Sequence, residues 1–179
     1  GAGWRAKRVT SAEVLIEQSE LKLPESVALP HEGNNLSYLE QRNISAELAA
    51  YFNLRFSLSG GFHYYGENGQ SLVQDYSMRV IVPIFNIEGV LASFQGRDVT
   101  GHAEKKYLFP PGHAATGSLL YNAHNVIGCN KLLICEGAFD VMAAKSALDQ
   151  DYDLRDVGVV GTFGKNLSFD RTNAHGHDQ

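Results

Sequence analysis

The chain has 179 residues, of which 44% are hydrophobic and 20% charged, and its formal net charge is −5. These values exclude wholesale disorder, a collagen-like repeat and a coiled coil, and the negative charge argues against a polycationic nucleic-acid binder while leaving room for a local basic groove. No apolar run approaches the roughly 20 residues of a membrane span, and two cysteines are too few for a disulfide framework, so a reducing cytoplasm is expected.

The N-terminal part of the chain predicts short helices followed by strands. Residues 1–35 look loosely organised, with a short helix over SAEVLIEQSELKL that Pro24, Pro30 and a Gly-Asn-Asn turn then end. Residues 36–54 predict two short helices broken at Asn43, with Ser45 as the N-cap of the second. Residues 57–74 are rich in Gly and Tyr and predict irregular strands with a tight turn.

Residues 78–99 give a clear hairpin signal. Two β-rich runs, RVIVPIF and VLASFQGR, flank a short Gly-containing loop. Because Pro83 has no N–H group, we expect the first run at a sheet edge or at a bulge. KKYLFPPG, residues 105–112, follows as an extended segment that ends in a turn. We therefore expect residues 36–124 to form a mixed α+β subdomain.

The pattern changes after this subdomain. The apolar run KLLICEG at 131–137 is typical of a strand buried on both faces, with Cys135 as a buried small hydrophobe. The Ala-rich segment that follows predicts a helix over 138–150, and VGVVGTFG predicts a second buried strand. This order predicts a parallel βαβ unit within residues 125–168, with a tail at 169–179.

Glu136 stands at the carboxyl end of the first of these strands, followed by Gly137 and the helix. Ligands of open parallel sheets bind beyond the carboxyl ends of the strands, where a carboxylate can hold Mg²⁺ together with substrate phosphates. Asp140 lies one helical turn further, so both carboxylates can face one point. The residues alone leave two interpretations open: a divalent-cation site, or acidic groups that stabilise the helix N-terminus.

A family resemblance follows from these motifs and their order. CEGAFDVMAA, residues 135–144, resembles the glutamate motif of Toprim domains, which bacterial-type primases, topoisomerases of types IA and II and some nucleases share. RVIVPIF, GRD, KKYLFPPG and LLYN precede it, and VVGTFG follows it, in the order of bacterial-type (DnaG-like) primase cores. The resemblance covers residues 36–168, and the amino-acid sequences of the motifs are more similar to those of phage or mobile-element primases. It implies an α/β fold, an α+β subdomain followed by a partial Toprim-type parallel sheet.

The resemblance also implies a function and a set of site residues. The expected reaction is template-directed synthesis of RNA primers on single-stranded DNA from ribonucleoside triphosphates, with Mg²⁺ or Mn²⁺, away from membranes in a bacterial or phage-infected cell. A replicative helicase is the expected partner. Glu136 and Asp140 would be the catalytic and metal-binding carboxylates. Arg97 and Lys106 match the family's basic residues that line the template and nucleotide groove, and Arg79 matches the arginine that opens the hairpin. The resemblance implies that all three bind the template or the nucleotide by neutralising phosphate charge.

Two departures from the family pattern stand out. Residues 113–120 lack the lysine that primases usually carry shortly before Leu-Tyr. The Asp-x-Asp pair of a Toprim metal site is expected on a later strand, and no such pair follows Gly164. The chain is therefore expected to be incomplete on its C-terminal side. Tyr107 and Tyr121 stand beside Leu and Phe, so we expect both in the core.

Two other functions remain open from the sequence. A Toprim nuclease would share Glu136 and Gly137, and it would cleave DNA with Mg²⁺ in the absence of ribonucleotides. A non-catalytic Toprim-derived module would bind single-stranded DNA or a replication partner. Such a module would depend on Arg97 and Lys106 and would not need Glu136.

Overall fold

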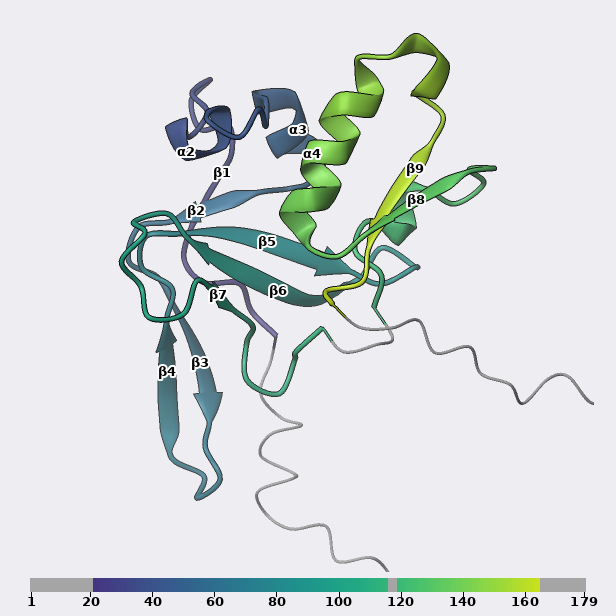
Figure 1. The fold of residues 1–179 in the computed structure, drawn as a ribbon. Coiled ribbons are helices and arrows are strands. Elements are labelled where there is room, and N and C mark those ends of the chain that lie inside the picture. Colours follow the sequence, from purple (N-terminus) through teal and green to yellow (C-terminus); the bar gives the residue numbers. More distant parts are fainter. Residues whose placement is uncertain (1–20, 116–118, 165–179) are drawn as a thin grey trace, which may run out of the picture. The chain divides into compact units, whose positions relative to one another are not determined.

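The computed structural model describes residues 21–115 and 119–164, which form two compact units (Figure 1). The first unit comprises the described residues up to Ile84 together with Leu91–Ala114, and the second comprises Phe85–Val90 together with the described residues from Ala115 onward. None of the helices in the described part of the chain is both long enough and apolar enough to cross a membrane. The expected tail at 169–179 and most of the short helix expected over SAEVLIEQSELKL lie outside the described residues.

The first unit is built on a five-stranded sheet of order β1-β2-β5-β6-β7. Its strands are β1 (Val27–Ala28), β2 (Arg55–Ser57), β5 (Arg79–Phe85), β6 (Leu91–Asp98) and β7 (Tyr107–Leu108). The hairpin predicted over residues 78–99 is thus confirmed as β5 and β6. β1 lies in the segment expected to be loosely organised, yet Val27 pairs with Phe56 and Leu29 is buried.

β5 is an interior strand, so the expectation of an edge strand is wrong. The fold accommodates Pro83 through the short length of β2. The register between the two strands pairs Arg55 with Ile81 and Ser57 with Arg79, and it ends before Pro83. The missing N–H group therefore removes no hydrogen bond from the β2–β5 ladder.

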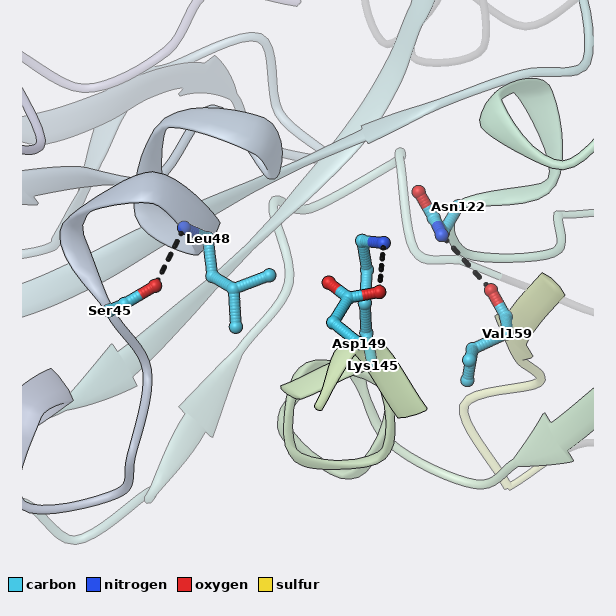
Figure 2. Close-up of polar contacts among 6 residues, drawn as sticks. All are labelled: Ser45, Leu48, Asn122, Lys145, Asp149 and Val159. Carbon is cyan, nitrogen blue, oxygen red and sulfur yellow. Dashed lines mark hydrogen bonds and ion pairs between the residues drawn. The ribbon is translucent and has the colours of Figure 1, made fainter. Parts of the chain in front are cut away.

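Short helices and a separate hairpin complete the first unit. α2 (Ser37–Glu40) and α3 (Ala46–Tyr51) are the two helices expected over residues 36–54. Asn43 separates them in a left-handed conformation with φ of 58°, and the Ser45 side chain accepts a hydrogen bond from the Leu48 N–H, as Figure 2 shows. β3 (Gly61–Tyr65) and β4 (Ser71–Asp75) form a regular antiparallel hairpin where irregular strands were expected.

The core of the first unit gathers around aromatic rings. Phe62, Tyr76, Ile81 and Phe94 form one buried cluster, and their exposed fractions are 1% or less. A Cβ atom at Gly96 would lie 2.5 Å from the Cδ1 atom of the Tyr76 ring. Glycine at this position of β6 therefore makes room for the ring.

The second unit contains the predicted parallel βαβ arrangement. β8 (Leu132–Cys135) pairs in parallel with β9 (Gly158–Gly161), and α4 (Ala138–Asp149) connects them. The 3-10 turn η1 (Ala123–Asn125) precedes β8, and the 3-10 turn η2 (Tyr152–Leu154) lies between α4 and β9. Ala138, Val141 and Met142 form the buried face of α4, at the spacing of an amphipathic helix. Near its end, Lys145 forms an ion pair with Asp149 at 3.1 Å (Figure 2).

The expectation that β8 is buried on both faces is wrong. Leu132 is 53% exposed and Ile134 is 52% exposed, and Cys135 is only half-buried. The reason is the small size of the sheet, because β9 is the single strand that pairs with β8 among the described residues. β9, by contrast, has all four residues buried.

Asn122 links the segment before η1 to β9. Its backbone is left-handed with φ of 68°, and its buried side chain donates a hydrogen bond to the carbonyl oxygen of Val159 at 3.0 Å (Figure 2). Next to it, Tyr121 and Gly161 exchange two backbone hydrogen bonds. Tyr121 is 3% exposed, which confirms it as a core residue.

The contact between Tyr76 and Gly96 yields a stability prediction. Gly96→Ala places a methyl group against the ring, and overpacking of this kind costs about 1–3 kcal/mol in the free energy of unfolding. Urea unfolding followed by fluorescence measures this loss. Combining Gly96→Ala with Tyr76→Leu removes the clash, so the double variant should lose less stability than the sum of the two single variants. Strict additivity would contradict the contact.

Candidate nucleic-acid interface

Three neighbouring residues of the first unit, Arg97, Lys106 and Tyr107, form a basic cluster, with Arg97 and Tyr107 at its centre. These two are register partners on β6 and β7, so their side chains are neighbours across the two strands. The guanidinium carbon of Arg97 lies 4.5 Å from the centroid of the Tyr107 ring, within the range of a cation–π interaction. Arg97 is 7% exposed, whereas Tyr107 is 41% exposed. Tyr107 was expected in the core, and that expectation is wrong, because β7 is the edge strand of the sheet.

Lys106 joins this cluster from the residue before β7. Its side chain is exposed, and its Nζ atom lies 5.9 Å from the centroid of the Tyr107 ring. Its backbone carbonyl accepts a hydrogen bond from the Asp98 N–H at 3.0 Å. The structure therefore brings together two of the three predicted cations, Arg97 and Lys106, near one exposed aromatic ring.

Arg79 has a different environment from the one expected of a phosphate contact. It is only 6% exposed, and its guanidinium donates hydrogen bonds to the carbonyl oxygens of Gly96, Lys105 and Lys106 at 2.8–3.3 Å. A Cβ atom at Gly96 would lie 3.2 Å from the Arg79 Cδ atom. Arg79 thus lies on the Gly96 face of β6, and because successive residues of a strand point to opposite faces, Arg97 points to the other face.

Asp98 is a buried carboxylate, 6% exposed, at the end of β6. Its Oδ1 atom accepts hydrogen bonds from the N–H and the hydroxyl of Thr100, and its Oδ2 atom accepts from the N–H groups of Gly101 and Ala103. Burial acts to raise the pKa of Asp98, but these hydrogen bonds outweigh it and lower the pKa to about 2. The carboxylate is therefore ionised at neutral pH and organises the loop that follows β6.

Glu136 lies in the second unit, at the carboxyl end of β8. Its side chain is exposed, and the carboxylate lies beside Gly164, where a Cβ atom would be 3.2 Å from Oε1. The backbone carbonyls of Cys135 and Glu136 accept hydrogen bonds from Thr162 and Phe163. The segment after β9 therefore closes against the end of β8, as expected of neighbouring parallel strands.

Asp140 is engaged at the start of α4. Its Oδ2 atom accepts a hydrogen bond from the Gly137 N–H at 3.0 Å, so it caps the helix as the second interpretation predicted. The charge of Asp140, together with burial as the larger cause, raises the pKa of the Cys135 thiol. No group of three or more His, Cys, Asp or Glu residues that could hold a metal ion occurs within residues 21–115 and 119–164. Glu136 and Asp140 thus do not form a complete magnesium site with other described residues.

Sequence reasoning missed two residues with clear structural roles. The signal for Asp98 was available, because the sequence Asp-Val-Thr-Gly after a strand places an aspartate where its side chain can accept hydrogen bonds from the following turn. Asn122 gave a weaker signal, since only the structure shows that its amide reaches β9. Neither residue was singled out, because both act on backbone groups. Those that Asp98 contacts lie within the loop after β6, and the one that Asn122 contacts is distant in the sequence.

Similar solved structures are bacterial primase catalytic domains. The catalytic domain of a DnaG primase bound to single-stranded DNA aligns with 74% of this chain and 48% of its own, with a TM-score of 0.56 and 25% identity. The Escherichia coli primase catalytic core aligns over the same shares with a TM-score of 0.57 and 24% identity. The RNA polymerase domain of Mycobacterium tuberculosis DnaG in complex with double-stranded DNA aligns with 74% of this chain and 48% of its own, with a TM-score of 0.54 and 19% identity.

The described chain has the fold of a DnaG-like primase catalytic core. Its antiparallel sheet and its parallel β8–β9 pair match that mixed α/β fold. The chain spans about half the length of the primase structures that it matches. No protein-family model matches the sequence, and comparison with curated protein sequences gave no match.

The environment of Asp98 in this primase-type fold predicts how stability depends on pH. Its folded pKa of about 2 is below the ordinary value of 3.8, so ionised Asp98 stabilises the fold above about pH 4, and this contribution is lost as the pH falls toward 2. Asp98→Asn should therefore be less stable than the unmodified protein at pH 6, and the difference should shrink between pH 4 and pH 2. Thermal unfolding followed by circular dichroism measures both. A difference that is constant with pH would contradict the assignment.

Proposed function

We propose that this chain is part of the catalytic core of a DNA primase, which synthesises RNA primers on single-stranded DNA from ribonucleoside triphosphates. The observation that carries the proposal is the primase-core fold over 74% of the chain. The order of the motifs between RVIVPIF and VVGTFG supports it independently, because order along the sequence and fold are separate properties. A Toprim-type second unit, a phage or mobile-element origin and a replicative helicase as partner belong to the same proposal.

The basic cluster of the first unit supplies the chemistry for holding nucleic acid. Lys106 is an exposed ammonium group that can neutralise a phosphate, and Arg97 presents a planar guanidinium against the Tyr107 ring. The exposed part of the Tyr107 ring can stack on a base or on a nucleotide. Phosphate contacts and stacking tolerate any sequence, as binding along a template requires.

The carboxylates of the second unit would serve the reaction centre. The Glu136 side chain is exposed, and its carboxylate has no hydrogen bond or ion pair with the described residues, so it is the carboxylate available to a divalent cation such as Mg²⁺ or Mn²⁺. Asp140 supports the turn that presents Glu136. Hard cations of this kind prefer carboxylates together with substrate phosphates, and further ligands beyond these two residues are required.

The first prediction of this proposal concerns DNA binding. Lys106→Ala and Arg97→Ala should each weaken the binding of labelled single-stranded oligonucleotides. Lys106→Ala should also reduce the salt slope, d log K against d log [salt], by about 0.7, because Lys106 is exposed and the change removes one phosphate contact. Arg97 is 7% exposed and lies against the Tyr107 ring, so Arg97→Ala should lower the affinity with a smaller change in slope. Fluorescence anisotropy between 50 and 300 mM salt measures both quantities.

A matched control for this experiment exists in the same unit. Arg42 is exposed and its guanidinium carbon lies 3.7 Å from the centroid of the Tyr38 ring, so Arg42→Ala also removes a cation–π pair and one positive charge. This variant should leave the salt slope unchanged. An equal effect of Arg42→Ala would show that net charge alone governs binding and would remove Arg97 and Lys106 from the interface.

The second prediction of the proposal concerns catalysis. Glu136→Gln removes a negative charge at nearly constant shape, so it should abolish primer synthesis by the protein that carries this chain, while the fold and DNA binding persist. Incorporation of labelled ribonucleotides on a single-stranded template measures synthesis. Glu47→Gln is the matched control, because Glu47 is an acidic residue in the first turn of α3, in the other unit. Undiminished synthesis by Glu136→Gln would overturn the assignment.

A non-catalytic DNA-binding module is the second candidate function, favoured by the use of Asp140 as a helix cap. It predicts metal-independent DNA binding that survives Glu136→Ala and weakens in the Arg97 and Lys106 variants, with no primer synthesis in any form of the protein. Cleavage of labelled DNA with Mg²⁺ in the absence of ribonucleotides would instead identify a nuclease. Ribonucleotide incorporation excludes the module and the nuclease together.

A further inference from the structure

Two buried charged residues hold the loop that precedes β7 from its two ends. Asp98 stands at the start of the loop and Arg79 contacts its end, and each is only 6% exposed. A buried charge is costly unless hydrogen bonds satisfy it. Here the hydrogen-bond partners of both groups lie almost entirely in the loop and in the adjoining strand, so both charges are used to fix one segment, residues 98–106.

Asp98 fixes the first half of this loop. Its two oxygens accept four hydrogen bonds from Thr100, Gly101 and Ala103, at 2.8–3.3 Å. The Thr100 hydroxyl in turn accepts a hydrogen bond from the His102 N–H. The backbone of residues 98–103 is therefore folded around one carboxylate.

Arg79 fixes the second half. Its guanidinium reaches the carbonyl oxygens of Lys105 and Lys106 on the loop, and of Gly96 on β6. The Asp98 N–H also donates to the Lys106 carbonyl. The backbone of residues 105 and 106 is thus held by three donors, while the side chains of both lysines remain exposed.

The consequence of this arrangement falls on Lys106 and Tyr107. Their backbone is set relative to β6, so the Tyr107 ring lies opposite Arg97 and the Lys106 ammonium lies near the same ring. A lysine on a freely moving loop would lose more conformational freedom on binding a phosphate than a lysine whose backbone is already fixed. Fixing the loop therefore favours binding without adding a contact.

We infer that Asp98 and Arg79 are positioning residues, which hold the loop of residues 98–106 so that Lys106 and Tyr107 engage a nucleic-acid or nucleotide phosphate beside Arg97. Neither Asp98 nor Arg79 touches the ligand in this arrangement. The inference rests on the proposed function, because it assumes that Lys106 binds phosphate. It assigns to Arg79 a role distinct from that of a groove-lining cation.

The experiment is a double-mutant cycle between Asp98 and Lys106, read by binding of a labelled dT oligonucleotide to the full chain. Lys106→Ala should weaken binding about fivefold at 0.1 M salt, which corresponds to one phosphate contact with a salt slope of about 0.7. Asp98→Asn should produce a similar loss and a similar drop in slope, although the change makes the protein more positive. Lys106→Ala introduced into the Asp98→Asn background should then cause little further loss.

Asp151→Asn is the matched control for the charge. The Asp151 carboxylate also organises a turn, by accepting a hydrogen bond from the Asp153 N–H, and it lies outside the loop, in the other unit. This variant should leave the affinity unchanged or slightly raised and should leave the salt slope unchanged. A loss of affinity equal to that of Asp98→Asn would overturn the inference, because any weakened turn would then suffice.

The outcomes separate the inference from the proposed function. If Lys106→Ala has no effect in the otherwise unmodified chain, the proposed interface fails. If Lys106→Ala has the same full effect with and without Asp98→Asn, the interface stands and the positioning role fails. Should Asp98→Asn not fold, Thr100→Val gives the same test, because it removes one hydroxyl donor to the Asp98 carboxylate. We then expect a smaller drop in the salt slope. An unchanged salt slope would contradict the inference.

Discussion

The Tyr76 ring lies against the backbone of β6 at Gly96, with a Cβ position only 2.5 Å from a ring carbon. The ring is fully buried, and its hydroxyl donates a hydrogen bond to the Gln74 side chain at 2.7 Å. β6 also carries Phe94 into the core and Arg97 into the candidate interface. The aromatic core and the candidate interface therefore share one strand, so a change at Gly96 that shifts β6 would also shift Arg97.

Burial distinguishes Arg79 and Asp98 from Lys106. Arg79 and Asp98 are buried, and hydrogen bonds to groups within the protein satisfy their charges, so these charges are not available to a ligand. Lys106 is exposed, so its charge is available to a ligand. This division explains how a chain with a net charge of −5 can present a local basic surface, since the surface depends on a few fixed cations and not on the total.

The sequence predicted the elements of the fold well where the signal was local. Ser45 as an N-cap, the hairpin of β5 and β6, and the parallel βαβ unit depend on neighbouring residues, and the structure confirms them. Exposure was predicted less well, because it depends on strand order. Tyr107 lies on an edge strand, which no residue near it could reveal. For the candidate site, the motif order proposes Arg97 and Lys106, and this stays a prediction. It could not show the carbonyl partners of Arg79, because tertiary packing sets them.

A structural role of Asp140 explains the spacing of Glu136 and Asp140 without requiring that both carboxylates bind a metal. The Asp140 carboxylate accepts the Gly137 N–H, and Gly137 is the residue that joins Glu136 to α4. The cap therefore fixes the turn at the carboxyl end of β8, while the hydrogen bond from the Phe163 N–H to the Glu136 carbonyl fixes it from the side of β9. Held at both sides, the backbone of Glu136 leaves only the side-chain torsions free. The Asp140 carboxylate thus holds the turn, while the exposed Glu136 carboxylate is left without a hydrogen bond to the described residues.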